Sequence, residues 1–474
     1  MIRRRFFSLV AGLMLFAVFA GQGCTRGLDP ATAAASKRVD LVIWGVVDDE
    51  EMYDAIFKDF HALHPNVTIS YRRLRLEEYE GELLNALAED RGPDIFMVHN
   101  TWVNKYMPKL APMPLSTKVS VQRIQGTVKK EAVYVLENQP TITLRAYKNA
   151  YPDAVIQDTV RTVNVSTKAD TRDLQQRVMA IPLSVDTLGM YVNKDLLNAA
   201  GIATVPTAWD KFQEAVPRLV KQDAQGNLLQ SAAGLGTGFN VEREPDIVTV
   251  LMMQNGAVMS AENGAPTFSQ VPAALSQQRD EPPAYQALSF YTDFANPAKA
   301  VYTWNNQQPN SLDAFIQGKT AFFFGYSYHL PVIKARASKL NLGIAPLPQI
   351  DGNPIVNVAN YWNFGVSKKT KSVDIAWNLV NFMSQPDEAK KYLDLAKRPA
   401  ALKSLLDAQL ENEDVGVFAS QVLTSKSWYR GDDPAAMENA FETMADNVLS
   451  GVEDIPTAVR NAQTKVGQTV TVSF

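Results

Sequence analysis

The chain has 474 residues, of which 46% are hydrophobic, 20% charged and 9% aromatic, a composition typical of a globular protein with a large core. The length favours two or three domains. The formal net charge is −4 and no long basic cluster follows the N-terminus, which argues against a nucleic-acid partner.

Residues 1–24 predict an export signal. Arginines at positions 3–5 precede an apolar run at 6–20, and small residues then lead to Cys24. The run is shorter than the roughly 20 residues that a helix needs to cross a bilayer. No later apolar stretch is longer, so we expect no membrane-spanning helix in the mature protein.

Cys24 is the only cysteine, so the chain cannot form an internal disulfide. The segment Ala-Gly-Gln-Gly-Cys at 20–24 resembles a bacterial lipoprotein processing site, although Gly21 stands where such sites usually carry Leu. The resemblance implies that Cys24 becomes the acylated N-terminus, and a plain secretion signal is the alternative. Residues 25–38 are small and polar, which favours a flexible tether to the membrane.

After the tether, apolar runs alternate with amphipathic stretches. The pattern predicts strands at 39–46, 67–71 and 94–98 and helices at 50–64 and 77–89. This order favours an open α/β sheet, in which ligands bind beyond the carboxyl ends of the strands. Candidate contacts therefore lie at 47–50 and 99–102.

The signals in the rest of the chain are uneven. Residues 116–168 are polar and give no clear assignment, whereas 178–193 form a long β-rich stretch that could cross between two lobes. A helix ending at Gly201 follows, and Thr207 is expected to cap the next helix. A buried strand is expected at 321–325, and helices are expected from 367 to the end.

Several short segments occur in an order that is similar to a known family. They are Gly-Pro-Asp-Ile at 92–95, Ile-Pro at 181–182 with Asn-Lys-Asp at 193–195, Ala-Gly-Ile at 200–202 with Pro-Thr-Ala-Trp at 206–209, Gly-Lys-Thr-Ala at 318–321, and Ala-Pro-Leu-Pro at 345–348 with Gly-Val-Ser at 365–367. In this order the segments resemble the family-1 extracellular solute-binding proteins, the group that includes the maltose-binding protein.

The resemblance implies an α/β, two-lobed periplasmic-binding-protein fold of type II, with hinge-crossing strands and a C-terminal helical segment. Lobe 1 would comprise 39–185 and 359–411, and lobe 2 would comprise 186–358 and 412–474. It also implies an exported monomer, anchored to the outer face of the cytoplasmic membrane or periplasmic. That protein would capture a sugar or oligosaccharide between the lobes and deliver it to the transmembrane subunits of an ABC permease, without a cofactor and without catalysis.

A sugar site needs aromatic platforms for the C–H faces and polar groups for the hydroxyls. Loop position and the resemblance together give two sets of candidate ligand-binding residues. The first lobe and the crossing segments supply Asp48, Asp49, Asn100, Trp102, Asp186, Trp362 and Asn363. The second lobe and its C-terminal segment supply Asn240, Glu242, Glu244, Tyr326, Tyr328, Trp428 and Arg430. Helix capping is the alternative for the aspartates that follow the first strand. A hinge role is the alternative for Asp186, and core packing is the alternative for the aromatic residues.

Other functions keep weaker support. A glycoside hydrolase needs two carboxyl groups across a cleft, but 50 acidic residues supply such pairs by chance. The closest histidine pair, His61 and His64, ends an amphipathic helix where we expect a solvated face, so no metal site is predicted. A binding protein for a polyamine, a metal chelate or a peptide remains open, because carboxylates and aromatic rings would serve those ligands too.

Overall fold

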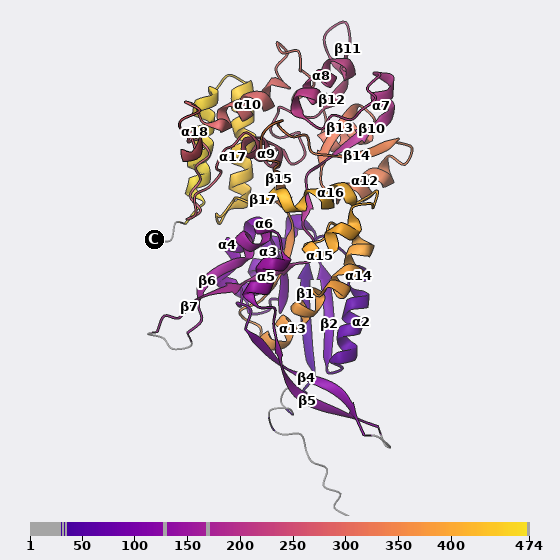
Figure 1. Cartoon of the computed structure of the whole chain (residues 1–474), viewed down its shortest axis with the longest axis vertical. Coiled ribbons are helices and arrows are strands. Elements are labelled where there is room, and N and C mark those ends of the chain that lie inside the picture. Colours follow the sequence, from indigo (N-terminus) through magenta and orange to yellow (C-terminus); the bar gives the residue numbers. More distant parts are fainter. Residues whose placement is uncertain (1–29, 31–32, 34–35, 127–129, 167–170, 472–474) are drawn as a thin grey trace, which may run out of the picture.

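The computed structural model describes residues 30, 33, 36–126, 130–166 and 171–471. The export signal, Cys24 and most of the tether therefore lie outside the described residues. Two lobes stand one above the other, joined by strands at the waist (Figure 1). Within the described ranges, no helix is both long enough and apolar enough to cross a membrane.

A mixed five-stranded sheet forms the centre of lobe 1. Its order is β2-β1-β3-β16-β8, in which β1 runs parallel to β2 and β3, and β16 runs antiparallel to both of its neighbours. The strands span Val39–Gly45 (β1), Val67–Arg73 (β2), Ile95–His99 (β3), Trp362–Val366 (β16) and Ala180–Pro182 (β8). The sequence predicted the first three of these strands to within two residues.

The helix predicted at 50–64 is a short 3-10 turn, Glu50–Met52, followed by α2 (Asp54–Leu63). Helix α2 buries Ile56, Phe57 and Phe60 against the sheet, as its apolar spacing indicates. The expectation of a solvated His64 is wrong, because its side chain is buried. Its Nδ1 lies 2.9 Å from the carbonyl oxygen of Ser120 on a neighbouring ribbon.

A second five-stranded sheet forms the centre of lobe 2, with the order β11-β12-β13-β10-β14. Its strands span Lys221–Gln222 (β11), Leu228–Ala233 (β12), Thr320–Gly325 (β13), Gly189–Asn193 (β10) and Leu342–Pro346 (β14). Every residue of β13 is buried, which agrees with the apolar run that predicted it. The helix after position 207 begins at Trp209, and its N-cap is Ala208 without a side-chain hydrogen bond, so the expected Thr207 cap is wrong.

The β-rich stretch at 178–193 does cross between the lobes, as three short strands in three different sheets. Strand β8 belongs to the lobe 1 sheet and β10 to the lobe 2 sheet. Between them, β9 (Asp186–Thr187) pairs with β15 (Asn357–Asn360), which also pairs with β17 (Ser425–Lys426). This small sheet at the waist brings together three distant parts of the chain.

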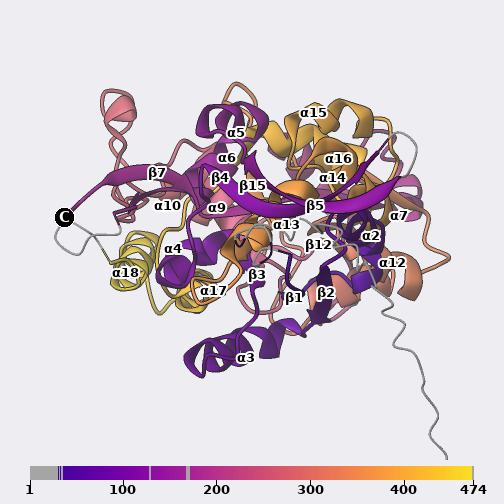
Figure 2. The same cartoon turned by 90° about the horizontal axis from the view of Figure 1, so that it is seen from below.

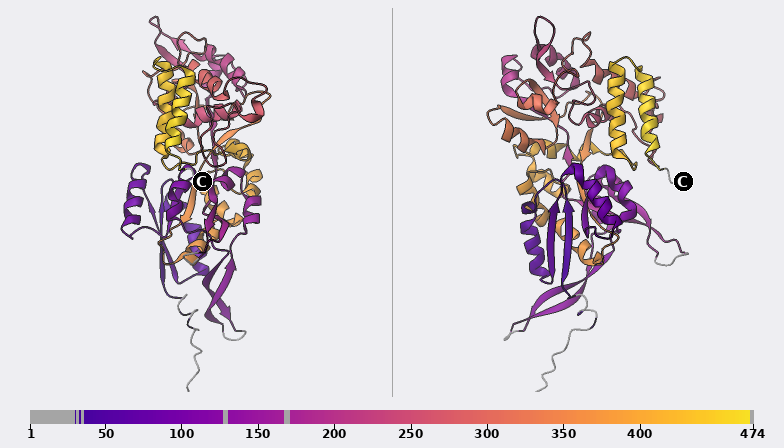
Figure 3. Two further views of the ribbon diagram at one scale, coloured as in Figure 1. Left: turned by 90° about the vertical axis from the view of Figure 1, so that its left-hand side faces the viewer. Right: turned by 180° about the vertical axis from the view of Figure 1, so that it is seen from behind.

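The region 116–168, to which the sequence gives no clear assignment, contains one complete ribbon, two helices and the first strand of a second ribbon. They are β4 (Ser116–Gln125), β5 (Glu131–Pro140), α5 (Leu144–Ala150), α6 (Asp153–Thr159) and β6 (Val160–Asn164), which pairs with β7 (Leu174–Val178). The β4–β5 ribbon projects from the end of lobe 1 that lies away from the waist (Figures 1 and 3) and curves across that end when seen from below (Figure 2).

Helices cover both sheets. Around lobe 1 they are α3 (Leu76–Ala88), α4 (Val103–Tyr106), α13 (Val373–Met383), α14 (Pro386–Ala396) and α15 (Lys403–Leu406). Those of lobe 2 and the waist are α7 (Lys194–Ala199), α8 (Trp209–Leu219), α9 (Glu244–Gln254), α10 (Pro283–Asp293), α11 (Ser311–Ile316), α12 (His329–Arg336), α16 (Gly416–Gln421), α17 (Pro434–Leu449) and α18 (Ile455–Gln468). The α17–α18 pair closes the C-terminal side of lobe 2 (Figure 3).

Each lobe has its own hydrophobic core. One cluster of buried residues draws on 41–185 and 359–422, and a second draws on 188–358 and 429–466. Because separate cores meet only at the waist, each lobe can move as a body relative to the other.

Candidate functional site

A cleft of about 830 Å³ lies at the waist, beyond the carboxyl ends of β1 and β3. The lobe 1 side and the crossing strands supply Val46, Val47, Asp48, Arg73, Arg75, Leu76, Glu77, Glu80, Met97, His99, Thr101, Trp102, Leu183, Ser184, Asp186, Asn360, Tyr361, Trp362, Phe364, Tyr392 and Arg398. Lobe 2 faces them with Glu242, Arg243, Tyr328, Pro434, Ala435 and Glu438. Both lobes therefore contribute charged and aromatic groups to one cavity.

Two tryptophans form the aromatic wall of the cleft. Trp362 opens β16 directly opposite His99 of β3, and Trp102 follows β3 in a short 3-10 turn. Their ring centroids lie 5.3 Å apart at 75°, so one ring meets the other edge to face. Tyr106 stacks on Trp102 at 5.9 Å from outside the cleft. Since both tryptophans are partly exposed, this wall offers apolar ring surface to a ligand.

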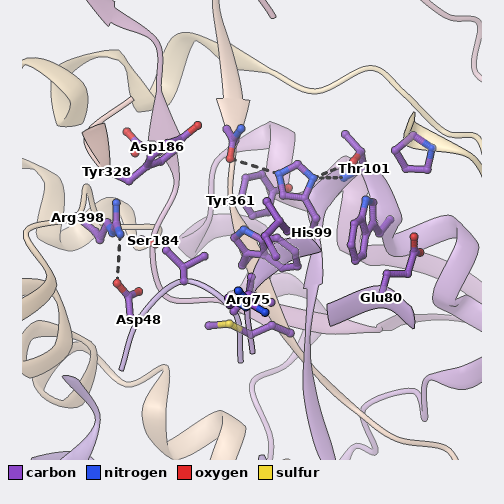
Figure 4. Close-up of a pocket in the computed structure, with 18 of the residues that line it drawn as sticks. Asp48, Arg75, Glu80, His99, Thr101, Ser184, Asp186, Tyr328, Tyr361 and Arg398 are labelled. Carbon is purple, nitrogen blue, oxygen red and sulfur yellow. Dashed lines mark hydrogen bonds and ion pairs between the residues drawn. The ribbon is translucent and has the colours of Figure 1, made fainter. Parts of the chain in front are cut away.

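His99 provides a neutral polar edge beside this wall. Its Nδ1 lies 2.8 Å from the Thr101 hydroxyl and its Nε2 lies 3.3 Å from the amide oxygen of Asn360 (Figure 4). Burial lowers the pKa of His99 to about 4, and the nearby Arg243 acts in the same direction. The ring is therefore uncharged at neutral pH and fit for hydrogen bonding to a neutral ligand.

Asp48 is held by groups from the far end of the lobe 1 sequence. The Arg398 guanidinium lies 3.1 Å from Oδ1 (Figure 4). The Tyr392 hydroxyl donates to Oδ2 at 2.8 Å. The guanidinium carbon also lies 5.9 Å from the Tyr328 ring centre of lobe 2. Arg398 thus joins a carboxylate of one lobe to an aromatic face of the other.

Asp186 sits where the chain crosses between lobes. Its Oδ1 accepts from the backbone N–H of Thr187 at 2.9 Å, and its Oδ2 accepts from the Ser327 hydroxyl at 2.6 Å. Burial raises the pKa of Asp186, and the positive charge of Arg398 opposes that rise. The residue lines the cleft and also ties the crossing strand to lobe 2, so the ligand and hinge roles weighed from sequence are both compatible with its position.

Lobe 2 presents a carboxylate and a guanidinium. Glu242 lies 3.7 Å from Nε2 of His329 and accepts from the Asn310 amide at 3.2 Å, and His329 is the main cause of its lowered pKa. Arg243 adopts a left-handed backbone with φ of 58°. Its side chain donates to Asp246 at 2.8 Å and pairs with Glu438 at 3.0 Å.

The structure thus brings six of the sequence candidates together at the cleft: Asp48, Trp102, Asp186, Glu242, Tyr328 and Trp362. Of the two tyrosines after β13, Tyr328 is partly exposed in the cleft, whereas Tyr326 is fully buried and donates to Asp246 at 2.7 Å.

Other candidates on lobe 1 lie outside the cleft because the packing turns them inward or outward. Asn100 is buried and donates to the carbonyl oxygen of Ala359 at 3.3 Å, and Asn363 is buried and donates to that of Val98 at 3.1 Å. Asp49 points to the surface and pairs with Arg73 at 2.9 Å. None of these three side chains lines the cavity.

The remaining candidates serve the structure of lobe 2 and the waist. Asn240 donates to the carbonyl oxygens of Asn305 and Gln308, each at 3.0 Å. Glu244 is fully buried under the start of α9. Trp428 packs edge to face on Phe441 at 5.8 Å, and Arg430 pairs with the buried Asp158 at 2.7 Å. These residues lie away from the cavity.

Sequence reasoning missed several charged and polar residues that line the cleft, among them Arg243, Tyr392, Arg398 and Glu438. Tyr392 lies on α14 and Arg398 directly after it, more than 300 residues from Asp48 in sequence. No local motif marks them. The only sequence signal is their place: an aromatic residue in the second half of a predicted helix and an arginine just after that helix.

Metal chemistry has no support in the part of the chain that is described, where no group of three or more His, Cys, Asp or Glu side chains could hold an ion. His61 and His64 point to different backbone oxygens, those of Val67 at 2.8 Å and Ser120 at 2.9 Å.

The two sheets, the crossing strands and the cleft between separate cores define a two-lobed periplasmic-binding-protein fold. The chain belongs to the bacterial extracellular solute-binding protein family, whose sequence profile matches residues 46–390. The family resemblance stated from sequence is therefore confirmed.

Named relatives agree with this placement. The chain is 26% identical to the multiple sugar-binding protein of Streptococcus mutans over 59% of its own length and 64% of the relative's. It is 21% identical to the galactooligosaccharide-binding protein of Bacillus subtilis over 62% of its length and 65% of the relative's. The match thus spans less than two thirds of each relative. The GacH receptor of Streptomyces glaucescens, solved unliganded and with acarbose, has the same fold with a TM-score of 0.63 at 19% identity, covering 91% of this chain and 99% of the receptor.

Proposed function

We propose that the protein is the extracytoplasmic solute-binding component of an ABC importer, and that it captures a sugar or oligosaccharide in the interlobe cleft and delivers it to a membrane permease. The observation that carries this proposal is the wall formed by Trp362 and Trp102 with polar groups of both lobes around it. Ring faces suit the C–H faces of a sugar, and fixed carboxylates and guanidinium groups suit its hydroxyls.

Several charged side chains of the cleft already form ion pairs within the protein, and this favours a neutral polyhydroxylated ligand. Arg398 is paired with Asp48, Arg243 with Asp246 and Glu438, and Glu80 with Lys105 at 2.7 Å. A charged ligand would have to compete with these internal partners, whereas a hydroxyl can donate to a carboxylate that remains paired. The names of the sugar-binding relatives support the same class of ligand.

Closure of the lobes would follow from ligand contacts on both sides. Lobe 1, as 39–185 with 359–411, supplies the tryptophans and Asp48, and lobe 2, as 186–358 with 412–474, supplies Tyr328 and Glu242. A ligand that touches both lobes binds the closed form more tightly and so shifts the protein toward it. The family consists of binding proteins, and we propose no catalytic role for the cleft.

Export and anchoring complete the proposal. The signal at 1–24 would direct secretion, acylated Cys24 would hold the mature protein as a monomer at the outer face of the cytoplasmic membrane, and residues 25–38 would form the tether.

A thermal-shift screen tests the ligand class. The mature chain is melted with mono- and oligosaccharides, polyamines and short peptides, each in excess. At a hundred times its dissociation constant, the right sugar should stabilise the folded protein by about 2.7 kcal/mol. A shift produced by a polyamine or a peptide alone would replace the sugar in this proposal, and hydrolysis of an added glycoside would replace binding by catalysis.

A further inference from the structure

Four lysines without ion-pair partners in the described ranges gather at the end of lobe 1 opposite the cleft. Lys37 precedes β1, Lys118 lies on β4, and Lys368 and Lys371 follow β16. Strands β1 and β3 begin at this edge of the sheet, and the antiparallel β16 ends there, which is why these positions converge. Lys118 and Lys371 line the same hollow as Val39. All four side chains are exposed.

Most acidic groups at this end are already neutralised. Asp40 pairs with Arg38 at 3.0 Å, and Asp90 pairs with Lys369. Asp374 is exposed beside Lys371, and the Asp94 carboxylate accepts from Thr370 and the backbone of Val42. These two acids offset only part of the charge of the four lysines. The end of lobe 1 is therefore basic, although the whole chain carries a formal net charge of −4. The positive charge of this end therefore comes from where the lysines lie and not from the overall composition of the chain.

The chain enters lobe 1 at the same end. The Ser36 hydroxyl lies 2.9 Å from that of Ser120 on β4, so the tether leaves the folded body beside the lysines. The residues between Cys24 and Ser36 can span at most roughly 40 Å, at about 3.3–3.6 Å per residue. If Cys24 is acylated, as proposed above, the bilayer cannot lie farther than this from the basic end.

The β4–β5 ribbon adds apolar surface at this end. Ile124, near the outer end of β4, is 73% exposed, and Leu115 just before β4 is 69% exposed. The ribbon projects beyond the lobe on the side where β1 begins (Figures 1 and 3). Basic side chains with exposed apolar ones beside them are the combination found on surfaces that lie on anionic membranes.

We infer that this basic end, defined by Lys37, Lys118, Lys368 and Lys371, rests on the anionic phospholipid headgroups of the membrane. Electrostatic attraction to the bilayer and the proposed lipid anchor act together, since a polybasic surface strengthens a lipid anchor. In this resting orientation lobe 1 lies between the bilayer and the cleft, so the cleft at the waist is held away from the membrane surface.

Vesicle co-sedimentation of the chain that starts at residue 25 tests this inference without any acyl group. The vesicles contain either phosphatidylcholine alone or phosphatidylcholine with phosphatidylglycerol. At about 0.01 M salt, where the screening length is about 30 Å, the anionic vesicles should bind at least tenfold more protein than the neutral ones. At about 0.15 M salt the difference should shrink, because screening then acts within about 8 Å.

A pair of matched triple variants locates the contact. Lys118→Glu with Lys368→Glu and Lys371→Glu should lose at least tenfold of the binding to anionic vesicles. Lys221→Glu with Lys319→Glu and Lys339→Glu changes the charge equally on exposed lysines of lobe 2 and should retain it. Equal losses in both variants, or equal binding of the wild type to both vesicle types, would overturn the inference. The sugar-induced thermal shift, measured on the same proteins, reports the fold and the proposed function separately.

Discussion

Trp362 takes its place in the cleft from strand register. Its pairing with His99 puts the indole at the carboxyl end of β3, beside Trp102, while Asn363, one residue on, turns into the sheet. Because side chains alternate between the two faces of a strand, a register shift of one residue between β16 and β3 would put Asn363 in the place of the Trp362 ring. The position of a single ring therefore depends on the pairing of a whole strand.

Trp362→Ala should weaken sugar binding roughly tenfold or more, since ring stacking contributes about 0.5–1.5 kcal/mol beyond the buried area. Isothermal titration with the sugar found in the screen measures this change. Trp428→Ala is the matched control, because Trp428 packs on Phe441 away from the cleft. It should lower the melting temperature and leave the affinity unchanged. Equal affinities for the Trp362 variant and the wild type would remove the platform from the site.

Glu244 shows how a buried acid links stability to pH. Both carboxyl oxygens lack a hydrogen-bond partner within the described ranges. Burial raises the pKa of Glu244 well above its ordinary value, and the neighbouring acids Glu442, Asp446 and Asp246 raise it further. The folded protein therefore retains this proton at pH values where the unfolded chain has released it.

Glu244→Gln should accordingly remove a loss of stability that grows as the pH rises above the ordinary carboxyl range. Each pH unit in which only the unfolded chain is ionised costs about 1.4 kcal/mol. Urea unfolding between pH 5 and about pH 8 checks this, with wild type falling relative to the variant. The exposed Glu262→Gln serves as control. Parallel curves for wild type and the Glu244 variant would show that the carboxyl ionises freely.

At the scale of elements, continuous apolar runs predicted several strands of the two sheets, whereas the β4–β5 ribbon was missed. The continuous apolar runs of β1, β3 and β13 follow from helices or other strands that cover both faces. Strand β4 buries Thr117, Val119 and Val121 on one face and Ser120 on the other, so polar residues stand at buried positions and the apolar alternation is weak. The ribbon could not be recognised from apolar alternation.

The site divides in the same way. Residues that follow a strand, such as Asp48 and Trp102, could be predicted because sheet topology fixes where strands end. Arg398 and Tyr392 reach the cleft from the end of α14, and their partner Asp48 lies at the other end of the lobe's sequence. Such contacts depend on tertiary packing, which no local pattern contains.

At the scale of the whole molecule, the proposed acylation of Cys24 can be tested directly. Cys24→Ser should release it from washed membranes, because no acyl chain would remain. The wash uses about 1 M salt, where the screening length is about 3 Å, so electrostatic attraction between the basic end and anionic lipid is suppressed. Gln22→Ser, which keeps the cysteine, should stay with the membranes. Immunodetection in the two fractions measures the outcome, and a Cys24 variant that persists in the membrane fraction would contradict lipidation.

The interleaving of the two cores has a consequence for biosynthesis. The lobe 1 core needs residues from 359–422 as well as 41–185, so a nascent chain cannot complete it until most of the polypeptide has been made. The N-terminal half is therefore left without its last packing partners during translation. Lobe 1 therefore becomes compact late, because its sheet and helices share one core with residues that are among the last to be synthesised.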